Sequence, residues 1–436
     1  MSTFPLITND RSAREISATI DQIDKALSSE QVLKAIVEGL PREVIDGVRR
    51  TLTIERRELA EAVGDYLEAK AGRPERLQRR VGSDPGSLLI VSRIARGWSQ
   101  KELARRVFLP EQQIQRYEAE RYRSINLAGL IRIGRALGVR VTADLSNAID
   151  SAYIPNLEAS SSEFQKVLKH AREHGWIERV GKSDDAEITE IRRNIAEHVG
   201  DHGTPSLFRA GLNVRENSDD WLLLAWKAQV TRRVLANSRM GKIRFRPTDV
   251  SWLPALVKLS ARDDGPVAAQ QLLAEHGIAL VVEPQIAGMG IDAAAFLVGS
   301  IPVIGMTLLR DSTDNFWYTL LHEVGHVILH YRTGLAAGFF DDIESASLDE
   351  VEAEADRFAS NMLIPEQLWL RSPARISRSP EPMVKLADQL GISPAIVFGR
   401  IRFERKNFSL FADKIGRGTV RKLFKRSSEE ITHEPA

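Results

Sequence analysis

The segment 315–331, NFWYTLLHEVGHVILHY, constrains this chain more than any other, because it places a His-Glu-x-x-His pattern within an apolar run. In an unbroken helix His322 and His326 lie one turn apart on the same face, about 6 Å along the axis, which is the spacing of two metal ligands. Glu323 can reach a water at the fourth coordination position, so the pattern predicts two ligands and a general base. The alternative interpretation is a pair of ordinary core histidines.

An acidic segment downstream, VEAEADRFASNMLIP, supplies candidates for a third ligand. Glu352 and Asp356 are four residues apart on a predicted helix, so one carboxylate can bind the metal while the other braces a metal-bound imidazole. Glu354 is the alternative third ligand. His330 continues the histidine stripe and is interpreted as a residue behind the ligands or in the core, with a ligand role as the alternative. The chain has no cysteine, so any metal rests on histidine and carboxylate.

Length and composition indicate several soluble domains. A chain of 436 residues is too long for one compact domain, and its 43% apolar and 27% charged residues are ordinary for soluble protein. The N-terminus lacks a basic segment followed by an apolar core, so we expect no secretory signal. The longest apolar run, 293–309, contains Pro302 and a Gly299-Ser300 turn, which predicts two strands in a hairpin rather than a membrane span. We expect a cytoplasmic protein.

The first part of the chain, residues 1–80, shows helical periodicity in three short amphipathic segments, 16–27, 44–52 and 59–67. These helices can serve interaction, dimerisation or packing against the next domain. The segment 70–87 is rich in Gly, Pro and Arg and is interpreted as a linker.

Residues 86–147 are predicted to form a helix-turn-helix. Ser99 and Glu102 form a capping box that opens one short helix, and Pro110 begins a second, which would enter the major groove of DNA. The whole chain has a formal net charge of +1, but this stretch has eleven Lys or Arg residues against five Asp or Glu, a surplus that suits phosphate contact. Side chains on the second helix can read base edges, unless they merely solvate its exposed face. The exposed positions are expected to be Gln112, Gln113, Gln115 and Arg116.

The chain resembles the XRE-type helix-turn-helix of phage repressors and HigA-like antitoxins in two segments, RGWSQKELARRVFLPEQQIQRYE and INLAGLIRIGRALGV. The resemblance implies that Gln100 touches the DNA backbone, while Gln112, Gln113 and Arg116 face the groove. The chain departs from the family pattern at two positions: Phe108 stands where the family usually has a turn glycine, and Glu120 stands where a glycine often follows the recognition helix.

Residues 160–246 are expected to be a mainly helical connecting region, preceded by a second linker at 151–163. The region contains two histidine pairs with i, i+4 spacing but no neighbouring base or acidic ligand. These histidines, His170, His174, His198 and His202, are interpreted as surface residues.

Residues 247–372 are expected to form a peptidase domain. The segment 277–369 resembles the ImmA/IrrE family of metallopeptidases in the blocks GIALVVE, IPVIGMTLLRD, DNFWYTLLHEVGHVILH, EAEADRFA and LIP. The resemblance implies a thermolysin-like (gluzincin) site that holds zinc, with manganese or iron as alternatives. It assigns His322 and His326 as ligands, Glu323 as the base, Glu352 as the third ligand and Asp356 as the residue behind it.

The chain as a whole resembles a HigA-like helix-turn-helix fused to an ImmA/IrrE metallo-endopeptidase. The expected fold class is α+β and multidomain, with helical N-terminal regions, a peptidase domain built on a small sheet, and a C-terminal helical element at 373–436. In that element VKLADQLGISPAIVFGRI is shaped like another helix-turn-helix, interpreted as packing against the peptidase, with DNA contact as the alternative. The basic stretch RGTVRKLFKR is either a solvated tail or a phosphate contact.

These features predict a DNA-binding transcriptional regulator, dimeric in the manner of palindrome readers, with a zinc endopeptidase domain. The resemblance implies that the peptidase cleaves a repressor-type protein or the chain itself. Besides DNA and a protein substrate, a toxin is a candidate partner. Tyr318, Tyr331 and His330 are candidate donors to the oxyanion of the reaction. One alternative is a non-proteolytic transcription factor or antitoxin whose metal domain senses a ligand or stabilises the fold. Another is a peptidase whose helix-turn-helix binds its protein substrate.

Overall fold

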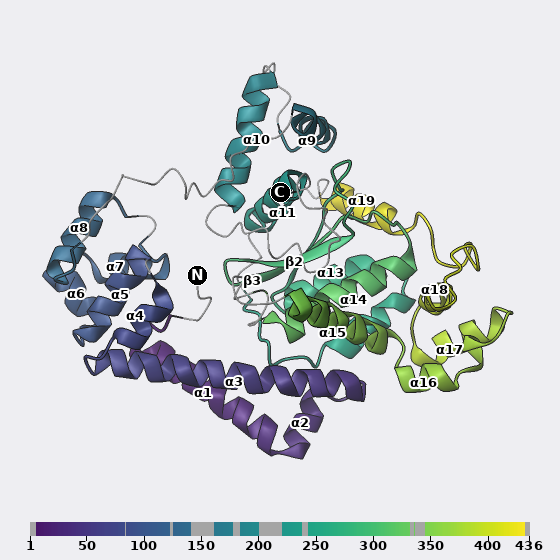
Figure 1. The fold of residues 1–436 in the computed structure, drawn as a ribbon, viewed down its shortest axis with the longest axis horizontal. Helices are drawn as coiled ribbons and strands as arrows, with labels where there is room; N and C mark the ends of the chain where they lie inside the picture. The colour runs from purple at the N-terminus through teal and green to yellow at the C-terminus, as the bar shows by residue number, and fades with distance from the viewer. Residues whose placement is uncertain are drawn as a thin grey trace. The chain divides into compact units, whose positions relative to one another are not determined.

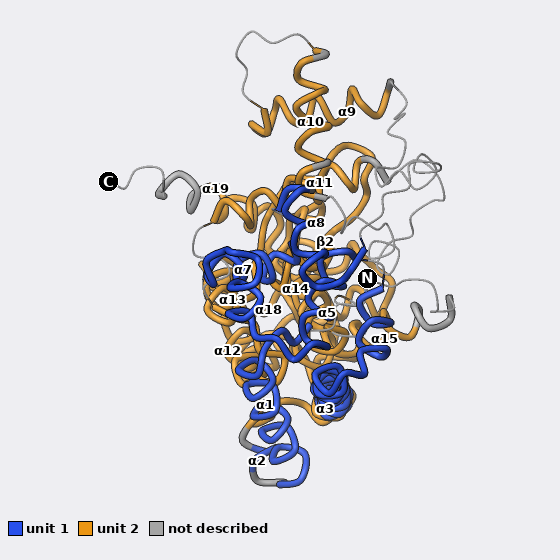
Figure 2. The backbone as a smooth tube through the Cα atoms, turned by 90° about the vertical axis from the view of Figure 1, so that its left-hand side faces the viewer, with its two compact units in different colours: residues 1–35, 49–151 blue, residues 36–48, 152–436 orange. Residues whose placement is uncertain are grey.

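The computed structural model describes residues 6–431 apart from 83, 123–124, 141–160, 178–183, 200–219, 238–242, 332–334 and 336–344. Two compact units divide the chain: Met1–Ala35 with Arg49–Ser151, and Ile36–Val48 with Ala152–Ala436 (Figure 2). The fold is α+β and multidomain, as predicted, with mostly helical units and one small sheet in the second. No helix among the described residues is long and apolar enough to cross a membrane.

The N-terminal part of the chain is a series of helices. They are α1 (Asp10–Ser28), α2 (Glu30–Ile36), α3 (Arg42–Lys70), α4 (Glu75–Val81), α5 (Pro85–Ala95), α6 (Gln100–Arg106), α7 (Glu111–Ala119) and α8 (Leu127–Ala136). The segments 44–52 and 59–67 belong to one continuous helix, α3, and not to two short ones, because no glycine or proline lies between them to end it.

The predicted linker at 70–87 is wrong, because it contains α4. Leu77 of this helix is buried, and Arg76 and Arg80 both form ion pairs with Asp65 of α3, whose side chain is 1% exposed. A buried carboxylate is costly unless it is paired, so these arginines hold α4 against α3. The basic composition that suggested a solvated linker therefore has a packing role at these two positions.

The second unit contains the remaining elements, and Figure 1 shows α13 and α14 beside its small sheet. Its helices are α9 (Ser161–Glu173), α10 (Asp184–Val199), α11 (Asp220–Ala236), α12 (Leu253–Lys258), α13 (Gly265–Glu275), α14 (Thr313–Leu329), α15 (Ser345–Leu363), α16 (Glu366–Arg371), α17 (Glu381–Leu390), α18 (Pro394–Glu404) and α19 (Val420–Ile431), with single 3-10 turns at Leu259–Ala261 and Pro373–Arg375. Its strands are β1 (Ala279–Val282), β2 (Ala293–Val298) and β3 (Ile301–Met306).

The sheet has the order β1-β3-β2, with β1 parallel and β2 antiparallel to β3. Val298 pairs with Ile301 across a two-residue turn in which Gly299 has a φ of 62°, so the predicted hairpin is confirmed. Helix α11 packs on one face, where a Cβ on Gly305 would lie 2.5 Å from the Trp226 ring. Helix α14 also packs against β2 and β3. Strand β2 is thus at a sheet edge and in contact with the helix that bears the histidines.

The C-terminal element packs against the second unit's core. Four side chains of α18, those of Ile396, Val397, Phe398 and Ile401, are almost completely buried, and α18 packs on α14. The packing interpretation is therefore confirmed for α18, and DNA contact through its exposed end, where Phe403 is 74% exposed, stays an alternative.

The basic stretch at 417–426 is partly structural. Arg421 of α19 donates two hydrogen bonds to the carbonyl oxygen of Leu308, at 3.1 and 2.6 Å. Leu308 has a φ of 53°, a left-handed backbone that leaves this carbonyl available to the guanidinium. Arg421 is therefore not part of a solvated tail.

The histidines of the connecting region differ from one another. His174 is exposed, as predicted, but the prediction for His170 is wrong: it is 7% exposed, with its ring 4.9 Å from that of Trp176. The ring of His198 is half-buried, and its Nδ1 lies 2.9 Å from the Asn194 carbonyl oxygen. His202 and most of the linker predicted at 151–163 lie outside the described residues.

Candidate metal centre and DNA-binding surface

Helix α14 presents the His-Glu-x-x-His pattern on one side and a hydrophobic surface on the other. Its apolar residues face the protein interior, which fixes the rotation of the helix about its axis. The fully buried ones are Phe316, Trp317, Leu320, Leu321, Val324, Val327 and Ile328. Because the helix is anchored in this way, the histidine side must face α15, the helix with which α14 packs most extensively.

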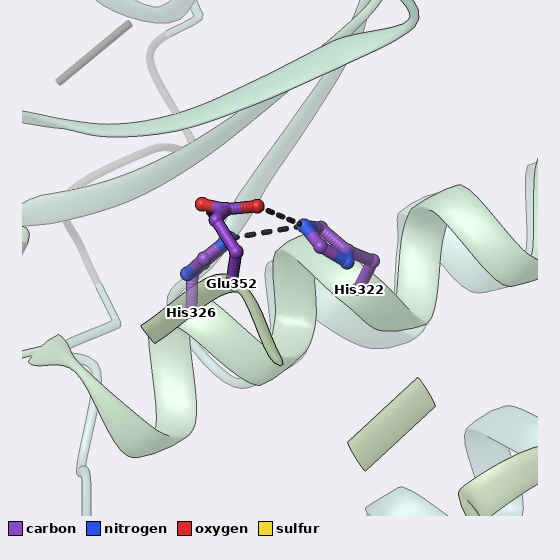
Figure 3. A group of neighbouring side chains, drawn as sticks. All are labelled: His322, His326 and Glu352. Carbon is purple, nitrogen blue, oxygen red and sulfur yellow. Dashed lines mark hydrogen bonds and ion pairs between the residues drawn. The ribbon is translucent and has the colours of Figure 1, made fainter. Parts of the chain in front are cut away.

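Three side chains from these two helices converge, as Figure 3 shows. The Nε2 atoms of His322 and His326 lie 3.0 Å apart, and the two carboxylate oxygens of Glu352 lie 3.2 Å from the first and 3.3 Å from the second. Edges of a tetrahedron around zinc with bonds of about 2.0–2.1 Å are about 3.3 Å long. The spacing and the donor set, two imidazoles and one carboxylate, therefore fit a small divalent metal.

The side chains of this cluster shift one another's pKa values. Burial lowers the pKa of His322, but hydrogen bonds to Asp356 and Glu352 outweigh burial and raise this pKa to about 10. Burial raises the pKa of Glu352, and hydrogen bonds from His322 and His326 outweigh it and lower the pKa to about 2. The carboxylate is thus ionised at neutral pH, the form that binds a metal cation.

Asp356 lies behind His322. Its Oδ1 atom is 2.9 Å from His322 Nδ1, the ring nitrogen that faces away from Glu352. The Tyr318 hydroxyl donates to the same oxygen, also at 2.9 Å. A carboxylate that accepts from Nδ1 fixes the tautomer and orientation of the ring and leaves Nε2 with a lone pair for a metal.

Glu323 lies next to the cluster without joining it. Its side chain is 7% exposed, and burial raises the pKa of its carboxyl group, against the lowering effect of the charges on His322 and His326. A hydrogen bond from the backbone of Ala295 on β2 also lowers this pKa. The edge strand and the candidate base are therefore directly connected.

The two remaining candidate site residues, His330 and Glu354, lie close to each other and outside the group of three converging side chains. His330 is 4% exposed, and burial lowers its pKa to about 3, so its ring is neutral. Its Nε2 is 3.8 Å from Glu354 Oε2 and has no hydrogen-bond partner among the described residues. The structure therefore brings Glu352, and not Glu354, to the two histidines, because positions 352 and 354 are about 200° apart around a helix.

Helices α14 and α15 run antiparallel with a regular pairing of polar residues. His326 faces Glu352, His322 faces Asp356, and Tyr318 faces Ser360, whose hydroxyl is hydrogen-bonded to that of the tyrosine. Sequence reasoning did not identify Ser360, although it continues the same four-residue spacing. The backbone of Ala295 was also missed, and no sequence pattern marks it.

The helix-turn-helix forms as expected from its capping box. The Ser99 side chain accepts from the Glu102 backbone N–H at 3.1 Å at the start of α6. Phe108, in the turn, is 92% exposed and has a φ of 56°, the left-handed region that a glycine would occupy without strain. Glu120 has a φ of −90°, so a residue other than glycine fits there without strain.

Candidate DNA-contacting residues occupy two environments. Gln112, Gln115 and Arg116 are exposed on α7, while Gln113 is half-buried and donates to the Tyr117 hydroxyl at 2.7 Å. Gln100 instead donates to Glu118 at 2.8 Å.

A buried ion pair explains the position of Gln100. Arg93 of α5 contacts both carboxylate oxygens of Glu118, at 2.6 and 2.7 Å, and each of these side chains is almost fully buried. Arg93 also donates to the carbonyl oxygens of Trp98 and Thr8, which ties α7 to the N-terminal segment. Gln100 completes this network, so its amide group is engaged within the protein.

Comparison with protein families identifies two domains. Residues 275–402 match the IrrE N-terminal-like domain, the M78 peptidase family, and residues 92–143 match a helix-turn-helix family. The first range contains the converging side chains of α14 and α15, and the second contains α6 and α7. Curated proteins and solved structures each give no match.

Proposed function

We propose that this chain, which carries a helix-turn-helix domain and an IrrE-like domain of the M78 peptidase family, is a DNA-binding regulator with an active metal-dependent endopeptidase. Its substrate would be a repressor-type protein bound near the same DNA, or the chain itself. The observation that carries the proposal is the convergence of His322, His326 and Glu352, whose ligand atoms lie within 4.8 Å of one another, beside the buried carboxyl group of Glu323. A structural metal site has no use for a base at that position.

The proposed metal ligands are the Nε2 atoms of both histidines and the carboxylate of Glu352. A bound zinc ion, or manganese or iron in its place, would act as a Lewis acid that lowers the pKa of water towards about 7 and polarises a peptide carbonyl. Asp356 would keep the His322 ring in the orientation and tautomer that bind a cation. His330 is not needed as a fourth protein ligand, because a catalytic site keeps its fourth position open for water.

Glu323 is the proposed general base. It would take a proton from the attacking water and later pass it to the leaving amine, a role that requires hydrogen-bond reach to both. The contact with the Ala295 backbone would keep the carboxyl group beside the edge strand, where the scissile bond is expected.

Strand β2 is the proposed holder of the substrate. It is the edge of the sheet next to α14, and an extended peptide can pair with the outward backbone groups of such an edge. Main-chain pairing would present a peptide bond to Glu323 whatever the side chains of the substrate. The choice of protein substrate would therefore depend on contacts outside strand β2.

DNA binding is assigned to α7, with Gln112, Gln115 and Arg116 as the residues that contact bases or phosphates and Gln113 as a further candidate. Gln100 donates one amide N–H to Glu118, so a contact with the DNA backbone would use its second N–H. We expect a homodimer, since two-fold symmetric readers match two half-sites.

The test compares the wild-type protein with Glu323→Gln in the native host, with labelling of all new protein N-termini. The variant is expected to bind as much metal and DNA as the wild type but to generate no new N-termini. His322→Ala and Glu352→Ala are expected to lose both metal and cleavage. A wild-type protein that binds metal and DNA but produces no Glu323-dependent cleavage would instead be a non-proteolytic transcription factor or antitoxin.

A further inference from the structure

The Tyr318 hydroxyl and His322 Nδ1 bind the same atom. Both lie 2.9 Å from Asp356 Oδ1, one from each of two successive turns of α14. Tyr318 was a candidate oxyanion donor on the basis of sequence, but its hydroxyl hydrogen is directed to the carboxylate. Burial raises the pKa of this hydroxyl, and the Asp356 charge raises it further, so Tyr318 remains a donor at neutral pH.

Asp356 needs this second contact because its side chain is 57% exposed. An exposed carboxylate can rotate, and water competes for its oxygens, so one hydrogen bond to an imidazole holds it weakly. A second donor on the same oxygen restricts the rotation. The second donor is itself held, because Ser360, one turn beyond Asp356 on α15, is hydrogen-bonded to the tyrosine oxygen.

We propose that Tyr318 is a positioning residue of the metal site, which holds Asp356 against His322 and thereby sets how tightly the site binds its metal. This inference rests on the proposed metal site. It adds Tyr318, a residue that contacts neither the metal nor the substrate but holds the partner of a ligand. It also removes Tyr318 from the candidate oxyanion donors.

The test is the zinc dissociation constant of the full chain, measured by competition with a chelator. Tyr318→Phe is expected to weaken zinc binding by about tenfold, the lower end of the range for partners of ligating histidines. The melting temperature of the metal-free variant should remain that of the wild type, because the ring and its packing are kept. Unchanged zinc affinity would overturn the inference.

A matched control is available elsewhere in the chain. The Tyr66 hydroxyl donates to Asp10 Oδ1 at 2.8 Å, the same kind of contact without a metal site beside it. Tyr66→Phe removes the same group and is expected to leave zinc affinity unchanged. An equal loss in both variants would show a general effect on folding and would contradict the inference.

A double-mutant cycle with Asp356→Asn tests the route of the effect. If Tyr318 acts through Asp356, then Tyr318→Phe should cause no further loss of zinc affinity in the Asp356→Asn background. Losses that multiply independently would overturn the inference while leaving the metal site intact. Failure of the wild-type protein to bind zinc, manganese or iron would overturn the proposed metallopeptidase and this inference together.

Discussion

A Cβ atom on Gly325 of α14 would lie 3.3 Å from the Cα atom of Ala355 on α15. Two atoms of the Phe358 side chain would be equally close, at 3.2 and 3.4 Å. The absence of a side chain at position 325 therefore permits the close approach of the two helices, and this approach brings Glu352 to the histidines.

Gly325→Ala should therefore force the helices apart by a few tenths of an ångström. We expect a loss of about 1–3 kcal/mol in the free energy of unfolding, together with weaker zinc binding. Gly64→Ala is the control, since a Cβ there meets nothing within 4 Å and alanine favours a helix by about 1 kcal/mol. Chemical denaturation and chelator competition measure the two effects. Zinc affinity equal to that of the wild type in Gly325→Ala would show that the close approach is not required.

Phe108→Gly is expected to stabilise the protein. A residue with a Cβ in the left-handed region destabilises the folded state by about 1–2 kcal/mol, and replacing it with glycine removes this strain. Glycine also stabilises the unfolded chain through its greater conformational freedom, which offsets about half of the gain. Phe108 is 92% exposed, so little packing is lost, and we expect a net gain of about 0.5–1 kcal/mol. Glu120→Gly, at a φ of −90°, should instead destabilise by a similar amount. Urea denaturation of both variants checks the opposite signs; a loss of stability in Phe108→Gly would refute the argument from strain.

Arg116→Ala is expected to weaken DNA binding. The probe is a duplex selected by the wild-type protein from a random library, and binding is measured across a range of salt concentrations. A phosphate contact predicts a salt slope smaller by about 1, and a base contact predicts relaxed specificity at one position. Arg11→Ala removes the same charge from an exposed position on α1 and should change neither. If the two variants behave alike, the assignment of α7 as the reading helix is wrong.

His170 predicts a pH dependence of stability. Burial lowers the pKa of its imidazole from an ordinary value near 6.5 to about 4, so the folded state holds it neutral. The unfolded chain binds a proton more readily, so stability is full above pH 6.5 and declines as the pH falls towards 4, by about 3 kcal/mol. His170→Leu should reduce the decline between pH 7 and 4, measured as the free energy of unfolding in urea. An unchanged decline would assign it to other groups.

Local patterns predicted much of the candidate metal centre. The four-residue spacing places His322 and His326 on one face, and the hairpin follows from the turn at Gly299. Each of these features depends on neighbours in sequence, where helix and turn geometry are nearly independent of the rest of the fold.

Other features depended on contacts between distant segments. The burial of His170 requires the Trp176 ring beside it, and α4 exists as a packed helix because Asp65 of α3 needs partners. Gln100 is a residue type that often contacts DNA, yet its side chain donates a hydrogen bond to Glu118 of the buried Arg93–Glu118 pair. The composition of a segment describes that segment alone, so it cannot reveal a contact with a residue that the fold brings in from a distant part of the chain.

The burial of α18 also affects stoichiometry. Ile396, Val397, Phe398 and Ile401 are turned inward, so if α18 serves only to pack and α7 is the reading helix, one chain would engage one half-site. A palindromic operator filled by two chains would then carry two catalytic centres. The number and spacing of operators on a chromosome would thus set the local concentration of the peptidase. Which proteins are cut would then depend on where the operators lie as well as on the sequence of the protein substrate.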